Sequence, residues 1–192
     1  MKTGNWPRRS IALRALAIYA FILLSGISHA NMPGEYDVKL VYLYNFTKYL
    51  TWPDPFPAED STSPYTICIM GKLPEDTPLQ DLKNKTTKNH PVDIRILTKY
   101  SPTSNCHILF LTKSLDRKIV HEITRMTTSG VLVVGETADF AKDSGEIGFV
   151  LDEKNRVRLE INLTRVQQKN ITIRSQLLEI ARKVYRTEDE QE

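Results

Sequence analysis

Two cysteines, Cys68 and Cys106, are the side chains of this sequence that most directly suggest covalent chemistry. Thiol–disulfide oxidoreductases need a Cys-x-x-Cys pair at a helix N-terminus, where the attacking thiol has a lowered pKa. The wide separation of these two cysteines does not supply such a pair. In an oxidising compartment we expect them to form a structural or conditional disulfide, with two buried free thiols as the alternative and a catalytic thiol as the least favoured interpretation.

Histidines and carboxylates give no metal or catalytic pattern. His90, His107 and His121 have no partner histidine, cysteine or carboxylate at the spacing of a metal site. The sequence also lacks the glycine-rich phosphate-binding loops and the Gly-x-Ser-x-Gly and His-Glu-x-x-His motifs of common enzyme classes. We therefore expect no catalytic residues, no metal and no cofactor.

Lys39 departs from the pattern of the first predicted helix, Glu35 to Leu50. At about 100° per residue, large apolar side chains share one broad arc of this helix, and Lys39 lies near its centre, close to Tyr42 and Phe46. One interpretation is that the alkyl chain packs while the ammonium group reaches solvent. The other is that the ammonium lies over aromatic rings at a binding surface, which makes these three residues candidates for partner binding.

The middle of the chain alternates strand-like and helix-like segments behind a proline-rich linker. Two of the strand-like runs, 107–111 and 131–135, are continuously apolar, as is typical of strands covered on both faces in a parallel sheet. The predicted strands are 65–70, 92–97, 107–111 and 131–135, and the predicted helix is 115–128. This order predicts an α/β fold with a mostly parallel central sheet flanked by helices.

The C-terminal part predicts a β-hairpin followed by helices. Residues 147–151 and 157–161 flank a polar turn, and Asn162 can cap a short helix that ends at Gln168. Apolar residues at helical spacing predict a final helix from Ser175 to Tyr185, and an acidic tail occupies residues 187–192.

The first thirty residues are typical of a secretory signal peptide. A basic stretch precedes an apolar run from Ala15 to Ile27, and Ser28-His29-Ala30 provides a small-x-small cleavage site. Such a run spans about 20 Å as a helix, which is shorter than a hydrocarbon core of about 30 Å. We expect the mature domain to occupy residues 31–186 and to lie outside the cytoplasm.

The net charge excludes a general electrostatic attraction to nucleic acid. The whole chain has a formal charge of +3, but four of its 26 basic residues lie in the first thirty positions, which contain no acidic residue. The remainder is therefore close to neutral, with 22 basic against 23 acidic residues. Neither nucleic acid nor an anionic membrane is expected to be held by overall charge.

Two stretches of the sequence resemble a known family. The run from Lys39 to Pro53, KLVYLYNFTKYLTWP, is similar to the opening motif of the YfiR/HmsC family of periplasmic proteins. The closing residues Arg158–Leu163 and Ser175–Leu178 are similar to that family too, and Cys68 and Cys106 fall in its order. The resemblance extends from Glu35 to about Tyr185.

The resemblance implies a regulator rather than a catalyst. Family members of the YfiR type bind the periplasmic domain of an inner-membrane diguanylate cyclase and hold it inactive, which lowers cyclic-di-GMP and biofilm formation. An outer-membrane OmpA-like lipoprotein can sequester the repressor, and members are often dimeric. Some members have four cysteines, whereas this chain has two.

Two other functions fit the residues less well. A periplasmic small-molecule receptor would place its ligand at the carboxyl ends of the parallel strands, near Gly71 and Gly135. A thiol oxidoreductase is disfavoured by the cysteine spacing.

Overall fold

The computed structural model describes residues 34–53 and 62–186. The predicted signal peptide, most of the proline-rich linker and the acidic tail lie outside the described residues.

The first described helix, α2 (Glu35–Tyr49), matches the predicted helix to within one residue. The backbone N–H of Gly34 donates to the Asp37 carboxylate at 2.7 Å, which satisfies one of the free donors at the helix start. The helix ends at Leu50, whose backbone is extended and which begins the short strand β1 (Leu50–Thr51). Strand β1 pairs antiparallel with β9 (Thr172–Ile173), so the C-terminal end of α2 is held by residues from the far end of the chain.

A central sheet follows, with the strand order β10-β8-β7-β6-β5-β2-β4-β3 in the described residues. Strands β2, β4, β5, β6 and β7 pair in parallel with one another, while β7 and β8 form the predicted antiparallel hairpin. The mostly parallel α/β fold is therefore confirmed. The strands are β2 (Tyr65–Met70), β3 (Thr86–Thr87), β4 (His90–Leu97), β5 (Ile108–Leu111), β6 (Leu132–Gly135), β7 (Ile147–Leu151), β8 (Val157–Asn162) and β10 (Lys183–Tyr185).

The predicted final helix is only half right. Helix α7 (Ser175–Glu179) ends early, and residues 183–185 instead form β10, which pairs in parallel with β8. The open edge of β8 explains the difference, because the Arg182 N–H donates to the Leu159 carbonyl at 2.7 Å and leads the chain into the sheet. Backbone hydrogen bonds along a sheet edge outweigh a short amphipathic pattern.

Short helices connect the strands. The predicted cap of α6 is confirmed, since the Asn162 side chain accepts a hydrogen bond from the Arg165 N–H at 3.0 Å. The remaining helices are α3 (Gln80–Lys83), α4 (Arg117–Met126), α5 (Phe140–Asp143), α6 (Leu163–Gln168) and a 3₁₀ turn at Pro102–Ser104.

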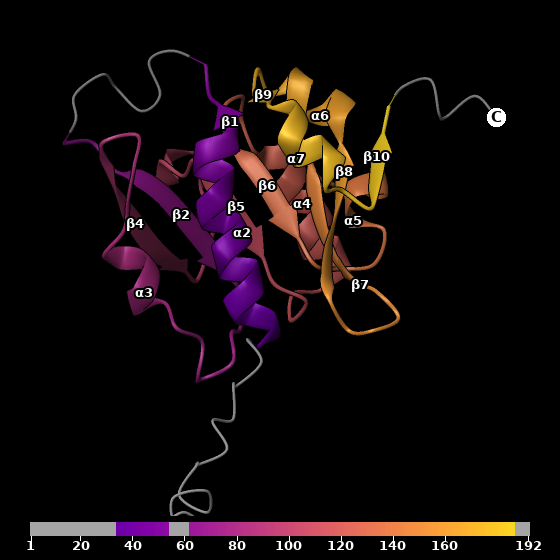
Figure 1. Ribbon diagram of the computed structural model, residues 1–192, viewed down its shortest axis with the longest axis horizontal. Coiled ribbons are helices and arrows are strands. Elements are labelled where there is room, and N and C mark those ends of the chain that lie inside the picture. The colour runs from indigo at the N-terminus through magenta and orange to yellow at the C-terminus, as the bar shows by residue number, and fades with distance from the viewer. Residues whose placement is uncertain (1–33, 54–61, 187–192) are drawn as a thin grey trace, which may run out of the picture. The chain divides into compact units, whose positions relative to one another are not determined.

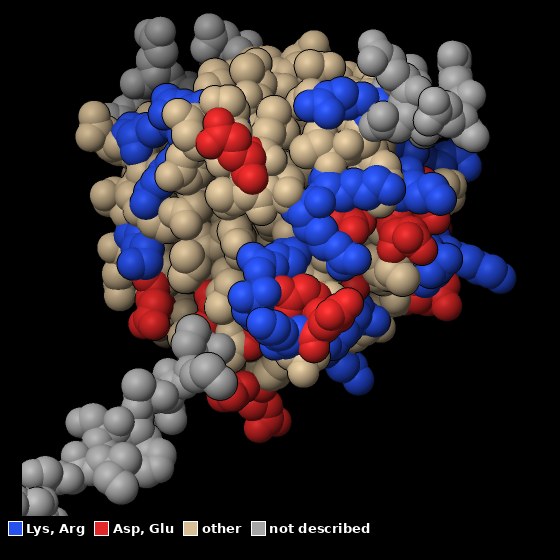
Figure 2. Space-filling model, turned by 45° about the vertical axis from the view of Figure 1, so that its right-hand side comes forward, with Lys and Arg blue, Asp and Glu red and all other residues tan. Residues whose placement is uncertain are grey.

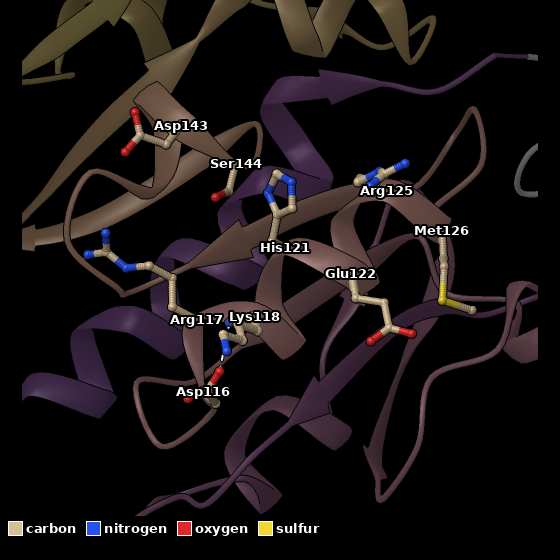
Figure 3. A pocket seen from close by; sticks show the side chains of 9 residues that line it. All are labelled: Asp116, Arg117, Lys118, His121, Glu122, Arg125, Met126, Asp143 and Ser144. Carbon is tan, nitrogen blue, oxygen red and sulfur yellow. Dashed lines mark hydrogen bonds between the residues drawn. The ribbon is translucent and has the colours of Figure 1, made fainter.

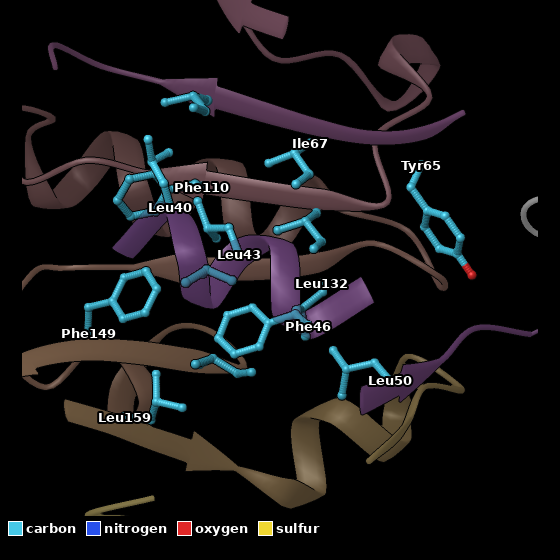
Figure 4. Close-up of a cluster of buried hydrophobic side chains, with 14 of the residues drawn as sticks. Leu40, Leu43, Phe46, Leu50, Tyr65, Ile67, Phe110, Leu132, Phe149 and Leu159 are labelled. Atoms are coloured by element: carbon cyan, nitrogen blue, oxygen red, sulfur yellow. The ribbon is translucent and has the colours of Figure 1, made fainter. Parts of the chain in front are cut away.

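Helices cover both faces of the sheet (Figure 1). Helix α2 lies over one face, where Leu40, Leu43 and Phe46 pack against Phe110 and Phe149 in the larger apolar core (Figure 4). Helices α4 and α5 cover the other face over a smaller core. Because side chains alternate along each strand, they contribute to two separate cores, one on each face of the sheet.

Candidate functional site

The side chain of Lys39, a residue of α2, is buried in the interior of the protein. Its ammonium group forms ion pairs with Glu35, one turn earlier, and with Glu136, which directly follows β6. It also lies 4.5 Å from the centroid of the Tyr36 ring. The Lys39 side chain is 3% exposed. The interpretation that its ammonium group reaches solvent is therefore wrong, because a buried carboxylate neutralises the charge inside the protein.

Glu136 joins α2 to the carboxyl end of the parallel sheet. Besides its ion pair with Lys39, its carboxylate accepts hydrogen bonds at 2.7 Å from the Tyr36 hydroxyl and from the Lys113 backbone N–H. Burial, together with the adjacent Glu136 carboxylate, raises the pKa of the Tyr36 hydroxyl. Burial acts to raise the pKa of Glu35 as well, but Lys39 outweighs it and that pKa lies below its usual range. The cluster thus fixes the first turns of α2 against the sheet.

The two aromatic candidates differ in exposure. Phe46 is fully buried and stacks on Phe149 at a centroid distance of 6.2 Å. Tyr42 is half-buried and packs 6.0 Å from the same ring. Lys39 and Phe46 are therefore interior residues in this conformation, and contact with a partner through Tyr42 stays a prediction.

The outer side of α2 is partly apolar and accessible. Val41 is 52% exposed, and a shallow groove of about 450 Å³ runs beside it. The groove is lined by Asp37, Val38, Val41, Tyr42 and Asn45.

Cys68 and Cys106 form a disulfide, with their Cα atoms 5.7 Å apart. Cys68 lies in the middle of β2 and Cys106 lies two residues before β5, the neighbouring strand. Both are buried in the smaller core, so the bond links two adjacent strands and is not placed for exchange at a surface. The expected disulfide is thus present in this structure.

The histidines lie in three different places. His107 is buried against Trp52 and Tyr65, on the face opposite Cys106, and its Nδ1 accepts a hydrogen bond from the Thr66 N–H at 3.0 Å. Burial lowers the pKa of His107 to about 4. His90 contacts the Ser63 carbonyl at 2.8 Å, and His121 is exposed on α4. Within residues 34–53 and 62–186 no group of histidine, cysteine and carboxylate side chains could hold a metal ion.

Side chains pack closely against the two glycines at the strand ends where a small ligand was expected. A methyl group on Gly71 would lie 2.0 Å from the Thr112 hydroxyl, and one on Gly135 would lie 2.3 Å from the Phe140 ring. Neighbouring side chains thus occupy the space that a side chain at either glycine would need. A ligand near Gly71 and Gly135 stays a prediction.

A hollow lies between α4 and the end of α5 (Figure 3). Its volume is about 860 Å³. The lining side chains are mostly charged: Asp116, Arg117, Lys118, His121, Glu122, Arg125, Met126, Asp143 and Ser144. This hollow could not be predicted, because it depends on how α4 and α5 sit side by side on the sheet.

Comparison with family models gives a match over most of the fold. The model described as YfiR/HmsC-like aligns with residues 36–182, which run from the first turn of α2 to the residue before β10. This chain belongs to the YfiR/HmsC-like family. A comparison with curated proteins finds no match.

Both motifs that resemble the family form elements of the fold. The opening motif of the family forms most of α2 and all of β1 here, and the closing motif forms β8 and part of α7. The YfiR/HmsC-like family is regulatory and non-catalytic, is typically periplasmic, and is associated with control of diguanylate cyclases. No helix in the described ranges has the length and apolar character needed to cross a bilayer.

Proposed function

We propose that this chain is a periplasmic repressor that binds the periplasmic domain of an inner-membrane diguanylate cyclase. Binding holds the cyclase inactive and so lowers cyclic-di-GMP and biofilm formation. The observation that carries the proposal is the YfiR/HmsC-like match over residues 36–182. The disulfide between Cys68 and Cys106 supports a periplasmic location, because such bonds persist in the oxidising periplasm.

Repression of this kind requires a difference in affinity. The protein must bind the inactive conformation of the cyclase more tightly than the active one, since equal affinity for both would shift nothing. The accessible side of α2, with its half-buried Tyr42 and its exposed Val41, offers an apolar contact for such binding.

The proposal includes export and two further partners. Cleavage after Ala30 gives a mature chain that starts at Asn31, which the intact mass of protein from a periplasmic extract tests. An OmpA-like outer-membrane lipoprotein sequesters the repressor and releases the cyclase. A homodimer is the proposed oligomeric state, and sedimentation of the mature protein tests it.

Deletion of the gene tests the function. We expect cyclic-di-GMP and surface attachment to rise in the deletion strain, and to return to the starting level when the cyclase gene is deleted as well. A plasmid copy of the wild-type gene serves as the control. Unchanged cyclic-di-GMP while the cyclase is expressed would reject the repressor, and a ligand-dependent shift in melting temperature would then favour a small-molecule receptor.

A further inference from the structure

Basic side chains line one flank of α4. Arg117, His121 and Arg125 follow one another at intervals of four residues and therefore lie on the same side of the helix. All three are exposed, and they border the hollow of about 860 Å³ (Figure 3). Asp143 and Ser144, at the end of α5, lie on the opposite side of that hollow.

The basic residues at the start of α4 are unfavourable for the stability of the helix. The first turn of α4 holds Arg117 and Lys118 and no acidic residue, although the positive end of the helix dipole disfavours cations there. Arg117 and Arg125 lie two turns apart with His121 between them, and Glu122 lies three residues before Arg125 without forming an ion pair with it. Asp116, the N-cap, and Glu122 are the two acidic residues of this segment. Residues that break a local rule in this way are expected at functional positions.

Carboxylates line the same hollow as this flank, but none of those described is in ion-pair contact with Arg117 or Arg125. Elsewhere, buried and surface cations meet carboxylates: Lys39 pairs with Glu136, Arg95 with Asp93, and Arg156 with Asp152. On the face drawn in Figure 2, basic and acidic side chains likewise lie next to one another. Arg117 and Arg125 form no ion pair with any carboxylate of residues 34–53 or 62–186.

We propose that the flank of α4 formed by Arg117, His121 and Arg125 binds an acidic segment of a partner protein. The inference rests on the proposed function for the class of partner, because a repressor of this kind acts by protein contact. The side chains suit carboxylates, since guanidinium groups bind them in a two-bonded geometry and the imidazole between them adds a further donor. The spacing of one helical turn per side chain lets an extended segment meet all three in succession.

The shape and the remaining charges favour a protein segment over a membrane. The site is concave, whereas a lipid surface would contact a convex or flat basic patch. Glu122 and Asp143 also border the hollow, and both would repel an anionic lipid layer. A polypeptide segment can place its own carboxylates beside the arginines and keep them away from these two acids.

Charge reversal tests the proposal. The probe is a twelve-residue peptide of alternating glutamate and serine, titrated into the full mature protein at low salt. We expect Arg117→Glu/Arg125→Glu to weaken binding at least about tenfold, and raised salt to weaken wild-type binding in the same direction. The matched control is Lys83→Glu/Lys99→Glu, which makes the same change of charge at two exposed lysines that neither belong to α4 nor line the hollow, and it should alter binding less than about twofold.

Loss of fold is separable from loss of contact. Arg117→Glu places an acidic residue in the first turn of α4, where it is favourable, and Arg125→Glu places one in the last turn, where it is unfavourable. The two effects oppose each other, so the melting temperature of the α4 variant should stay close to that of wild type. Equal binding by wild type and the α4 variant, equal weakening by the control variant, or no binding by wild type would each overturn the proposal. Binding to phosphatidylglycerol vesicles without binding to the peptide would overturn it in favour of a membrane.

A second measurement distinguishes this inference from the proposed function. The α4 variant is expressed in the deletion strain, and cyclic-di-GMP is measured. If wild type represses the cyclase and the α4 variant represses equally well, the proposed function stands and the contact surface is wrong. If the peptide binds at α4 but deletion leaves cyclic-di-GMP unchanged, the surface stands and the repressor function fails.

Discussion

The ammonium group of Lys39 forms an ion pair with the carboxylate of Glu136, and the two side chains are only 3% and 1% exposed. Removing one partner of a buried pair leaves an uncompensated charge in the interior, which costs far more than losing a surface ion pair. The pair also joins the first described helix to the carboxyl end of β6. Its integrity should therefore determine whether α2 stays on the sheet.

Lys39→Met should lower the free energy of unfolding by about 3–5 kcal/mol, measured by urea denaturation. Lys113→Met is the matched control, because that side chain is 58% exposed and lies 3.5 Å from Glu35, so we expect a loss below about 1 kcal/mol. The double variant Lys39→Met/Glu136→Gln should be less destabilised than the sum of its two single variants. A Lys39→Met protein as stable as Lys113→Met would contradict the buried-pair account.

The disulfide should stabilise the native protein by reducing the conformational entropy of the unfolded chain. Cys68 and Cys106 are 38 residues apart, and a closed loop of that size is worth roughly 4 kcal/mol in the chain-entropy treatment. We expect Cys68→Ala/Cys106→Ala to lose about that much stability, and reductant to destabilise wild type but not the double variant. Alkylation of two thiols in non-reduced periplasmic protein, denatured before labelling, would show instead that the bond does not form in the cell.

Stability should respond to pH through Glu146, a buried carboxyl that accepts a hydrogen bond from the Val133 N–H at 2.7 Å. Burial raises its pKa from 4.5 to about 7, against the opposing effects of that hydrogen bond and of the nearby Lys169 and Arg165. The folded protein therefore holds this proton more tightly than the unfolded chain, so this carboxyl favours folding at low pH. Its contribution falls as the pH rises from about 4.5 to about 7 and is lost above that.

Titration of His107 changes the stability of the fold in the opposite direction over nearly the same pH range. Its pKa falls from 6.5 to about 4 on folding, so its contribution is present above pH 6.5 and is lost as the pH falls to about 4. The two effects partly cancel in wild type. We expect Glu146→Gln to remove one of them, so that urea unfolding of the variant shows stability rising from pH 4 to 6.5. The same pH profile for variant and wild type would exclude titration of Glu146 in this range.

Gly135 should tolerate no side chain while Phe140 is present. A methyl group there would lie 2.3 Å from the Phe140 ring, so Gly135→Ala forces the ring or the strand to move. Overpacking of this kind costs about 1–3 kcal/mol, which thermal or urea unfolding measures. In a Phe140→Ala background the same substitution should cost almost nothing, and an equal cost in both backgrounds would refute the steric explanation.

Local patterns in the sequence predicted most of the elements correctly. Apolar runs located β2, β5 and β6, the proline after Trp52 located the end of α2, and the side chain of Asn162 located the start of α6. Each of these signals acts within a few residues. The error at Ser175–Tyr185 arose because the competing interaction, the open edge of β8, is supplied by residues about twenty positions earlier.

The candidate sites depended even more on distant residues. Lys39 was recognised as unusual, but Glu136 lies 97 residues away and nothing local marks it as the partner. The basic spacing of Arg117, His121 and Arg125 was visible in the sequence, whereas the hollow beside it required the position of Asp143. A signal that could have been used is the absence of acidic residues from the first turn of α4.

The position of α2 also determines when the protein can fold during synthesis. Its N-terminal half is held by Glu136, and its C-terminal end is held by β9, where Leu50 pairs with Ile173. The ribosome therefore releases the apolar side of α2 long before its last partner exists, and at about 5–20 residues per second the delay is on the order of 10 s. During that interval Leu40, Leu43 and Phe46 lack their native cover, and in an exported chain they stay uncovered until β9 has also crossed the membrane.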